Sequence, residues 1–175
     1  MRIIAGKLGG RHFDSTARAT HPMSEKMRGA IFNSLGDINN LTILDAFSGS
    51  GAIGFEAISR GASTASFVES NKNAQNDIEK NIRSLGLKYK AKLVKANIFT
   101  WIEIETSKFD IIVADPPYDK INIDRFKDIY KLLNSNGVFV LSLPGDHEIP
   151  VINRLVSIKN KNYSDSMLVF YKNNL

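Results

Sequence analysis

From residue 41 onward, segments patterned like buried strands alternate with segments that have the spacing of helices. Strand-like runs occupy residues 41–47, 64–70, 91–96, 109–114 and 138–141. Helical stretches lie near residues 51–60, 72–84, 97–104 and 122–133. Such alternation is typical of a parallel sheet covered by helices on both faces. Two further strand-like runs, 154–161 and 166–171, have no helix-length segment between them. The sequence therefore predicts an α/β fold whose seven-stranded, mostly parallel sheet ends in an antiparallel hairpin.

The residues before this region predict a small extension. Residues 2–6 and 10–13 are strand-like runs joined by a glycine-containing link, which indicates a β-hairpin. Ser24 is expected to cap a helix that runs to about Leu35, with Gly36 as its end. We therefore expect two parts: an N-terminal hairpin in residues 1–22, and the α/β domain in residues 23–175.

Composition excludes several classes of protein. There is no cysteine, and the three histidines are scattered, so neither a disulfide framework nor a metal site is expected. No apolar run approaches the ~20 residues of a membrane helix. Met1 leads into a basic segment without the apolar stretch of a signal peptide. A soluble, cytoplasmic protein is expected, with a monomer as the default.

Charge is concentrated near the N-terminus. The net charge is +5, and residues 1–30 hold six Lys and Arg against two Asp and Glu. A basic arm on a nearly neutral body suggests a polyanionic partner, with nucleic acid favoured over a merely solvated tail. The candidate RNA-binding residues are Arg2, Arg11, Lys26 and Arg28. If several of them bind phosphate, affinity should fall steeply with salt.

A glycine-rich loop follows the first strand of the alternating region. Gly49, Gly51 and Gly54 match G-x-G-x-x-G between a strand and a helix, which lets backbone approach a ligand at a helix N-terminus. Glu69, at the end of the second strand, is placed to hold ribose hydroxyls. By itself the motif fits both NAD and S-adenosylmethionine.

Asp45 favours S-adenosylmethionine. A carboxylate at the tip of the first strand would repel the pyrophosphate of a dinucleotide, whereas S-adenosylmethionine carries an ammonium and a sulfonium and no phosphate. Asn97 follows the third strand, where an amide can bond an adenine edge and also cap the next helix. The expected cofactor-binding residues are Asp45, Phe47, Gly49, Ser50, Gly51, Gly54, Glu69, Ser70, Asn97 and Ile98.

A carboxylate, two prolines and an aromatic ring follow the strand at 109–114. They are Asp115, Pro116, Pro117 and Tyr118. Proline lacks an N–H and has a fixed φ, so the loop leaves the sheet with its carbonyl groups turned outward. Asp115 and a nearby carbonyl can accept the two N–H bonds of an exocyclic amine, and Tyr118 can stack on the base. An ordinary turn would explain Asp and Pro alone; beside a cofactor loop, the four residues predict a catalytic site for a planar amine.

With these motifs the chain resembles the class I methyltransferases that modify exocyclic amines. More closely, it resembles the bacterial small-subunit (16S) rRNA guanine-N2 methyltransferases of the RsmD type. The resemblance spans nearly the whole chain and rests on residues 2–6, 10–11, 22–28, 30–33, 44–54, 67–69 and 115–118. The family usually has Arg and two threonines around the proline, where this chain has His21 and Met23-Ser24.

The resemblance implies a Rossmann-like fold and an activity. The expected reaction is methyl transfer from S-adenosylmethionine to the N2 amine of a guanine, guanine 966 by resemblance, in small-subunit rRNA of an assembled or assembling 30S particle. A DNA adenine-N6 methyltransferase is the nearest alternative, although the chain has no spare length for a target-recognition region. A non-catalytic RNA-binding or ribosome-assembly protein is a second alternative, and an NAD enzyme, which Asp45 disfavours, a third.

Overall fold

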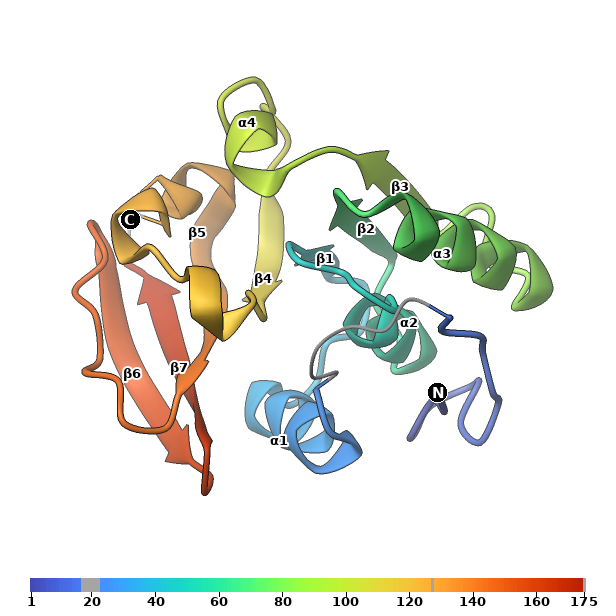
Figure 1. The fold of residues 1–175 in the computed structure, drawn as a ribbon, viewed down its shortest axis with the longest axis horizontal. Helices are drawn as coiled ribbons and strands as arrows, with labels where there is room; N and C mark the ends of the chain where they lie inside the picture. The colour runs from blue at the N-terminus through green and yellow to red at the C-terminus, as the bar shows by residue number, and fades with distance from the viewer. Residues whose placement is uncertain (17–22, 127, 175) are drawn as a thin grey trace.

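A computed structural model of the chain describes residues 1–16, 23–126 and 128–174. Its helices and strands alternate as expected (Figure 1). In chain order they are α1 Glu25–Leu35, β1 Thr42–Asp45, α2 Ala52–Ser59, β2 Thr64–Glu69, α3 Lys72–Ser84, β3 Ala91–Lys95, α4 Ile98–Ile102, β4 Phe109–Ala114, the 3₁₀ turns η1 Tyr118–Lys120, η2 Ile123–Phe126 and η3 Ile129–Leu132, then β5 Leu133–Pro144, β6 Leu155–Asn162 and β7 Ser166–Asn173. No helix among the described residues is long and apolar enough to cross a membrane.

The seven strands form one sheet in the order β3-β2-β1-β4-β5-β7-β6. The five strands from β3 to β5 are parallel, and β7 runs antiparallel between β5 and β6, so the predicted Rossmann-like sheet and terminal hairpin are confirmed. Helices α1, α2 and α3 cover one face, and α4, η2 and η3 the other. Because the strand order reverses direction at β1 and β4, their carboxyl ends are where ligands bind in open α/β sheets.

The prediction of an N-terminal β-hairpin is wrong. Residues 1–13 fold back on themselves, and backbone hydrogen bonds join Met1 to Phe13 and Ile3 to Gly10 and Arg11. Their β-pairing is limited to one isolated antiparallel bridge, between Arg2 and His12. The amides of Ile4 and Ala5 instead donate to the carboxylate of Glu56, and that of Leu8 donates to the Ser59 hydroxyl, both on α2. Because these three amides bond to α2, the pairing does not extend from the Arg2–His12 bridge into a β-hairpin. The expected division at residue 22 stays a prediction, because His21 and the rest of residues 17–22 lie outside the described residues.

Gly6 explains how closely this loop approaches α2. Its φ is +82°, and a Cβ built there would lie 1.9 Å from the carbonyl oxygen of Ser59. Only glycine fits both that conformation and that contact. Ile3 and Phe13 on either side of the loop are buried in the core shared by α1, α2 and α3. The segment is thus an integral layer of the fold.

The single helix expected near 122–133 is also replaced. The described residues there form two 3₁₀ turns, and β5 begins at Leu133, which pairs with Phe109 of β4. Phe126, Ile129 and Leu132 are buried against the sheet. The apolar spacing therefore correctly predicted a segment that covers the sheet. A long helix does not form there because Leu133 pairs with β4 as the first residue of β5.

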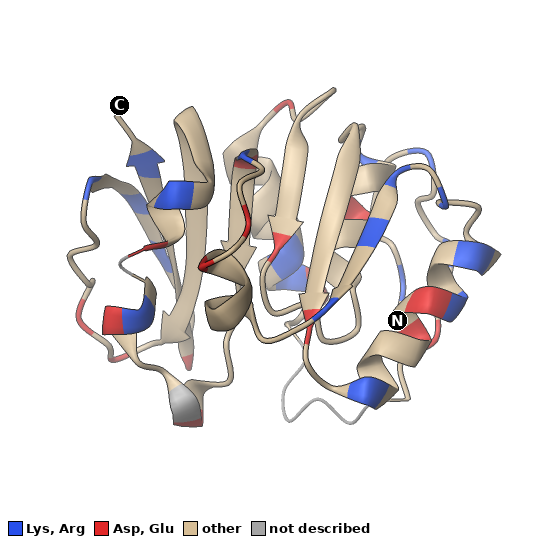
Figure 2. Cartoon of the chain, turned by 90° about the horizontal axis from the view of Figure 1, so that it is seen from above, with Lys and Arg blue, Asp and Glu red and all other residues tan. Residues whose placement is uncertain are grey.

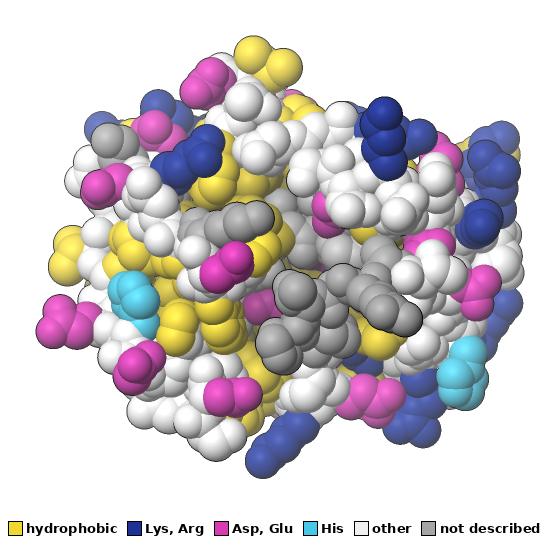
Figure 3. All heavy atoms as spheres, viewed as in Figure 1, with side chains coloured by type: hydrophobic (Ala, Val, Ile, Leu, Met, Phe, Trp, Pro, Cys, Tyr) yellow, Lys and Arg dark blue, Asp and Glu magenta, His cyan; other side chains and the backbone are white. Residues whose placement is uncertain are grey.

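Charge is distributed unevenly over this fold. Figure 2 shows Lys and Arg on α3, β3 and the loops beside them at one end of the sheet, and on β6 and β7 at the other. In Figure 3, basic side chains line the edge on the side of α3, whereas most acidic side chains lie elsewhere on that face. Basic side chains therefore gather on the α3 side among other places, away from the strand ends of β1 and β4.

Candidate active site

The topology brings the two principal sequence motifs together. Asp45 ends β1 and lies in register with Val113 of the neighbouring parallel strand β4. The N–H of Ala46 donates to the Val113 carbonyl at 2.9 Å, so the pairing continues to the strand ends. Asp115 comes two residues after Val113 in the chain. The carboxylates of the cofactor loop and of the Asp-Pro-Pro-Tyr motif thus emerge side by side at one edge.

Asp45 is almost wholly enclosed. Its residue is 3% exposed, and its Oδ2 accepts a hydrogen bond from the N–H of Gly54 at 3.1 Å. Burial raises the pKa of Asp45 to about 8; the Gly54 bond opposes this, and the charges of Asp115 and Glu69 reinforce it. Three carboxylates therefore converge on one point. Such a point favours a cationic ligand over a phosphate.

The three glycines of the loop have different roles. Gly49 has φ +49° and no protein atom within 4 Å of a built Cβ, so its backbone faces open space. A Cβ on Gly51 would lie 2.7 Å from the Phe55 ring, and one on Gly54 would lie 2.3 Å from the Phe67 ring. The first glycine thus leaves room for a ligand, Gly51 leaves room for the Phe55 ring, and Gly54 allows α2 to pack against β2.

A pocket opens beside the loop, at the carboxyl ends of β1, β2 and β3. It is lined by Ala46, Phe47, Val68, Glu69, Ser70, Ala96, Asn97 and Ile98. Five of the ten predicted cofactor residues are among these. Glu69 accepts from the N–H of Gly49 at 2.7 Å, so one side chain ties the end of β2 to the glycine loop. Asn97 caps α4, with its Oδ1 accepting from the N–H of Phe99 at 2.9 Å.

The Asp-Pro-Pro-Tyr residues occupy the other half of the edge. Pro116 is buried, Pro117 is exposed, and Tyr118 begins η1 with 38% of its surface exposed. Burial raises the pKa of Asp115 to about 6, and a hydrogen bond with Ser142 opposes that rise. Burial also raises the pKa of Tyr118. A partly buried carboxylate beside an accessible ring is suited to gripping an amine and stacking on its base.

Ser142 on β5 is a site residue that the sequence did not reveal. Its Oγ lies 2.6 Å from the Tyr118 hydroxyl, and it also bonds Asp115. The residue is 1% exposed. A serine within the apolar run of β5 was the available signal, because a buried polar side chain on a central strand needs a partner.

The four predicted RNA-binding residues are dispersed. Arg2 pairs with Glu25 at 2.8 Å, and Nη2 of Arg11 donates to the Ser84 carbonyl at 3.0 Å. Lys26 is exposed and lies 5.8 Å from the ring centroid of Tyr163. Arg28 is 0% exposed. Its predicted phosphate contact does not fit this structure, because α1, α2 and the N-terminal loop enclose its guanidinium.

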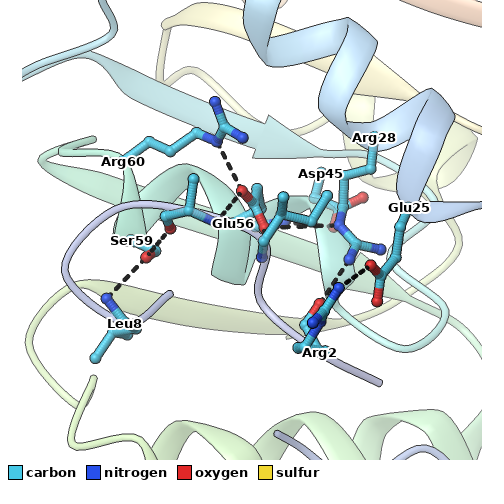
Figure 4. A network of polar contacts seen from close by, with 11 residues as sticks. Arg2, Leu8, Glu25, Arg28, Asp45, Glu56, Ser59 and Arg60 are labelled. Atoms are coloured by element: carbon cyan, nitrogen blue, oxygen red, sulfur yellow. Dashed lines mark hydrogen bonds and ion pairs between the residues drawn. The ribbon is translucent and has the colours of Figure 1, made fainter. Parts of the chain in front are cut away.

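Arg28 belongs to a buried network centred on Glu56 (Figure 4). The Glu56 carboxylate lies 3.7 Å from Nε of Arg28 and 2.7 Å from Nε of Arg60, and it accepts the two backbone N–H bonds of the N-terminal loop. Arg28 also donates to the Arg2 carbonyl at 2.6 Å. Charge pairing in the interior thus joins α1, α2 and the N-terminal loop, and α2 in turn holds Asp45 through Gly54.

Comparisons with known proteins agree with this geometry. A family model described as Conserved hypothetical protein 95 matches residues 1–172. Ribosomal RNA small subunit methyltransferase D of Escherichia coli K12 is 30% identical over 139 residues, which are 78% of this chain and 68% of that protein. A conserved hypothetical protein of Streptococcus pyogenes is 35% identical in structure-based alignment, with a TM-score of 0.78 over 83% of this chain and 94% of that one.

The structure of SMU.776, which is complexed with SAH, shares the fold alone. It is 16% identical, with a TM-score of 0.69 over 84% of this chain and 48% of that one. The whole-length family match, the sheet order and the carboxylate-lined edge lead to one assignment. The chain belongs to the Conserved hypothetical protein 95 family, the RsmD-like group of S-adenosylmethionine-dependent enzymes with the class I methyltransferase fold.

Proposed function

We propose that this protein methylates the exocyclic N2 amine of a guanine in small-subunit rRNA, with guanine 966 of the 30S particle as the expected target. The observation that carries the proposal is the placement of Asp115 and Tyr118 beside Asp45, at adjacent strand ends. The E. coli relative's name supports the rRNA substrate. When bound, S-adenosylmethionine supplies an electrophilic methyl group; in this proposal Asp45, Glu69, Gly49 and Asn97 would hold it.

Asp115 orients the acceptor amine. The lone pair of a guanine amine is delocalised into the ring, which makes the amine a poor nucleophile. Hydrogen bonds from its two N–H groups to Asp115 and the Pro116 carbonyl favour a pyramidal nitrogen with its lone pair exposed. Much of the acceleration then comes from positioning. The proton lost afterwards can rest on Asp115, whose pKa of about 6 lies near neutrality.

Tyr118 explains how the base is held. A guanine inside a helix cannot reach the strand ends, so the target base must be splayed out of its stack. The half-exposed Tyr118 ring offers a stacking surface, and the Ser142 hydroxyl fixes the ring's position. Unpaired bases in RNA allow this at low cost.

The test supplies labelled S-adenosylmethionine with 30S particles, naked rRNA or duplex DNA, each lacking the modification. Nucleoside analysis of the product follows. N2-methylguanosine from the particles is the expected result. N6-methyladenine from DNA would instead assign the protein as a DNA adenine methyltransferase. No label on any acceptor, with cofactor binding intact, would refute the reaction and favour a non-catalytic RNA-binding protein.

A further inference from the structure

A second basic segment lies outside the N-terminal region. Residues 71–95 carry seven Lys and Arg against two Asp and Glu. Both acidic side chains are already engaged: buried Asp77 accepts hydrogen bonds from Thr16, and Glu79 pairs with Lys95 at 2.8 Å. The net charge of the whole chain does not reveal this basic segment, because acidic residues elsewhere offset it.

The fold adds the N-terminal loop to this segment. The guanidinium of Arg11 donates to the carbonyl of Ser84, the last residue of α3. A cation is favoured there by the partial negative charge at a helix C-terminus. Lys80 and Arg83 lie one turn apart on the exposed side of the same helix. Two basic regions, whose contacting residues Arg11 and Ser84 are 73 positions apart in the chain, therefore meet at one place.

An exposed aromatic ring stands within this cluster. Tyr89 is 91% exposed, between exposed Lys88 and Lys90, and Nζ of Lys88 lies 5.9 Å from its ring centroid. We call Arg11, Lys80, Arg83, Lys88, Tyr89 and Lys90 the α3–β3 patch. Such exposure gives the ring almost no part in stabilising the core, so folding does not account for it.

The loop that presents Tyr89 is held at both ends. The N–H of Leu87 donates to the Ile82 carbonyl, and that of Lys90 to the Leu87 carbonyl, each at 2.9 Å. The Lys90 carbonyl accepts from Ala65 of β2 at 2.8 Å. The ring and its flanking lysines are thus fixed to α3 and the sheet, which lowers the ordering cost of binding.

The patch is remote from the catalytic edge. Lys90 precedes β3, whereas Asp45 and Glu69 lie at the opposite, carboxyl ends of the strands. A six-residue strand such as β2 places these ends ~16 Å apart. Any ligand that contacts both must therefore be larger than a nucleotide.

We infer that the α3–β3 patch docks a part of the substrate RNA remote from the target base. Its cations contact backbone phosphates, and Tyr89 stacks on an unpaired base. Clustered Lys and Arg supply the electrostatic attraction, and an exposed aromatic ring among them suits single-stranded RNA. The identity of this RNA rests on the proposed function.

The test measures binding of a labelled small-subunit rRNA fragment by fluorescence anisotropy, using the full chain at several salt concentrations. Tyr89→Ala should weaken binding about tenfold, and Tyr89→Phe, which keeps the ring, should bind like wild type. Lys88→Glu/Lys90→Glu should weaken binding further and flatten the salt dependence by ~0.7–0.9 per lost phosphate contact. Lys159→Glu/Lys161→Glu, on β6 at the other edge of the sheet, is the charge-matched control.

Cofactor affinity and thermal unfolding should be unchanged in every variant. Equal RNA affinity for the patch variant, its control and wild type would overturn the inference, as would binding of anionic vesicles in place of RNA. Failure of the proposed reaction is a separate result. Suppose that wild type binds the RNA, the patch variant does not, and no N2-methylguanosine is formed. That result would refute the proposed reaction but support the docking surface.

Discussion

The catalytic edge and the α3–β3 patch use charge in opposite ways. At the edge, Asp45, Asp115 and Glu69 converge despite their mutual repulsion, held by backbone N–H groups and by burial. On the patch, lysines and arginines spread over an exposed surface around one ring. Desolvation raises the pKa of Asp45 and of Asp115, whereas solvent leaves each patch cation sensitive to salt. Positioning a reaction and attracting a polyanion thus require different environments.

The largest expected effect separates chemistry from binding. Asp115→Ala should lower the methyl-transfer rate by about a thousandfold, because the acceptor amine loses its principal orienting group. Cofactor affinity, measured by calorimetry, should stay within a few-fold, and RNA affinity should not change. Asp119→Ala, at an exposed carboxylate four residues later, is the control. A wild-type turnover rate in Asp115→Ala would refute the proposal that Asp115 orients the acceptor amine.

Buried and exposed ion pairs offer a second contrast. Glu56→Gln should lower the free energy of unfolding by about 3–5 kcal/mol, because it leaves the enclosed Arg28 without a counter-charge. Glu79→Gln, which removes the exposed pair with Lys95, should have little effect. Chemical denaturation measures both. Equal stabilities would mean that the Glu56 network does not hold the N-terminal loop.

Ser142→Ala sharpens the view of the catalytic edge. Without its hydroxyl, Tyr118 loses a 2.6 Å contact and Asp115 loses a hydrogen bond that lowers its pKa. The maximal rate should fall about tenfold, the size of one neutral hydrogen bond, and the pH–rate profile should shift upward. Ser142→Thr keeps the hydroxyl and should restore the profile if the cavity accommodates the methyl group. An unshifted profile in Ser142→Ala would confine the residue to packing.

A further contrast concerns pH. The folded-state pKa of Asp45, about 8, exceeds its ordinary value, so the folded protein binds more protons than the unfolded chain between roughly pH 4 and 8. Stability of the ligand-free protein should therefore decline as pH rises through that range. Asp45→Asn should reduce the decline, with each kcal/mol worth about 2–4 °C in Tm. Thermal melts at pH 5, 7 and 9 measure it, and a slope identical to that of wild type would contradict the assignment.

Local sequence patterns correctly predicted the elements whose structure is determined by residues close together in the sequence. The alternation after residue 41, the Ser24 cap and the two strand-end motifs all reappear in the structure. The N-terminal hairpin did not, because the amides of Ile4 and Ala5 bond to Glu56, more than 50 residues away. Arg28 looked like a surface cation for the same reason: its partner is distant in sequence. Ser142 and the patch also arise only when separate elements meet.

The Glu56 contacts also determine when the N-terminal loop can become protected. The amides of Ile4 and Ala5 donate to the Glu56 side chain on α2, not to an acceptor in their own segment. These hydrogen bonds therefore cannot form in a folding chain until α2 is in place. Closing a loop of that length is entropically costly before other contacts form. During refolding, these two amides should therefore become protected from hydrogen exchange only when α2 docks. Their protection should appear later than that of the amides within α1 and α3.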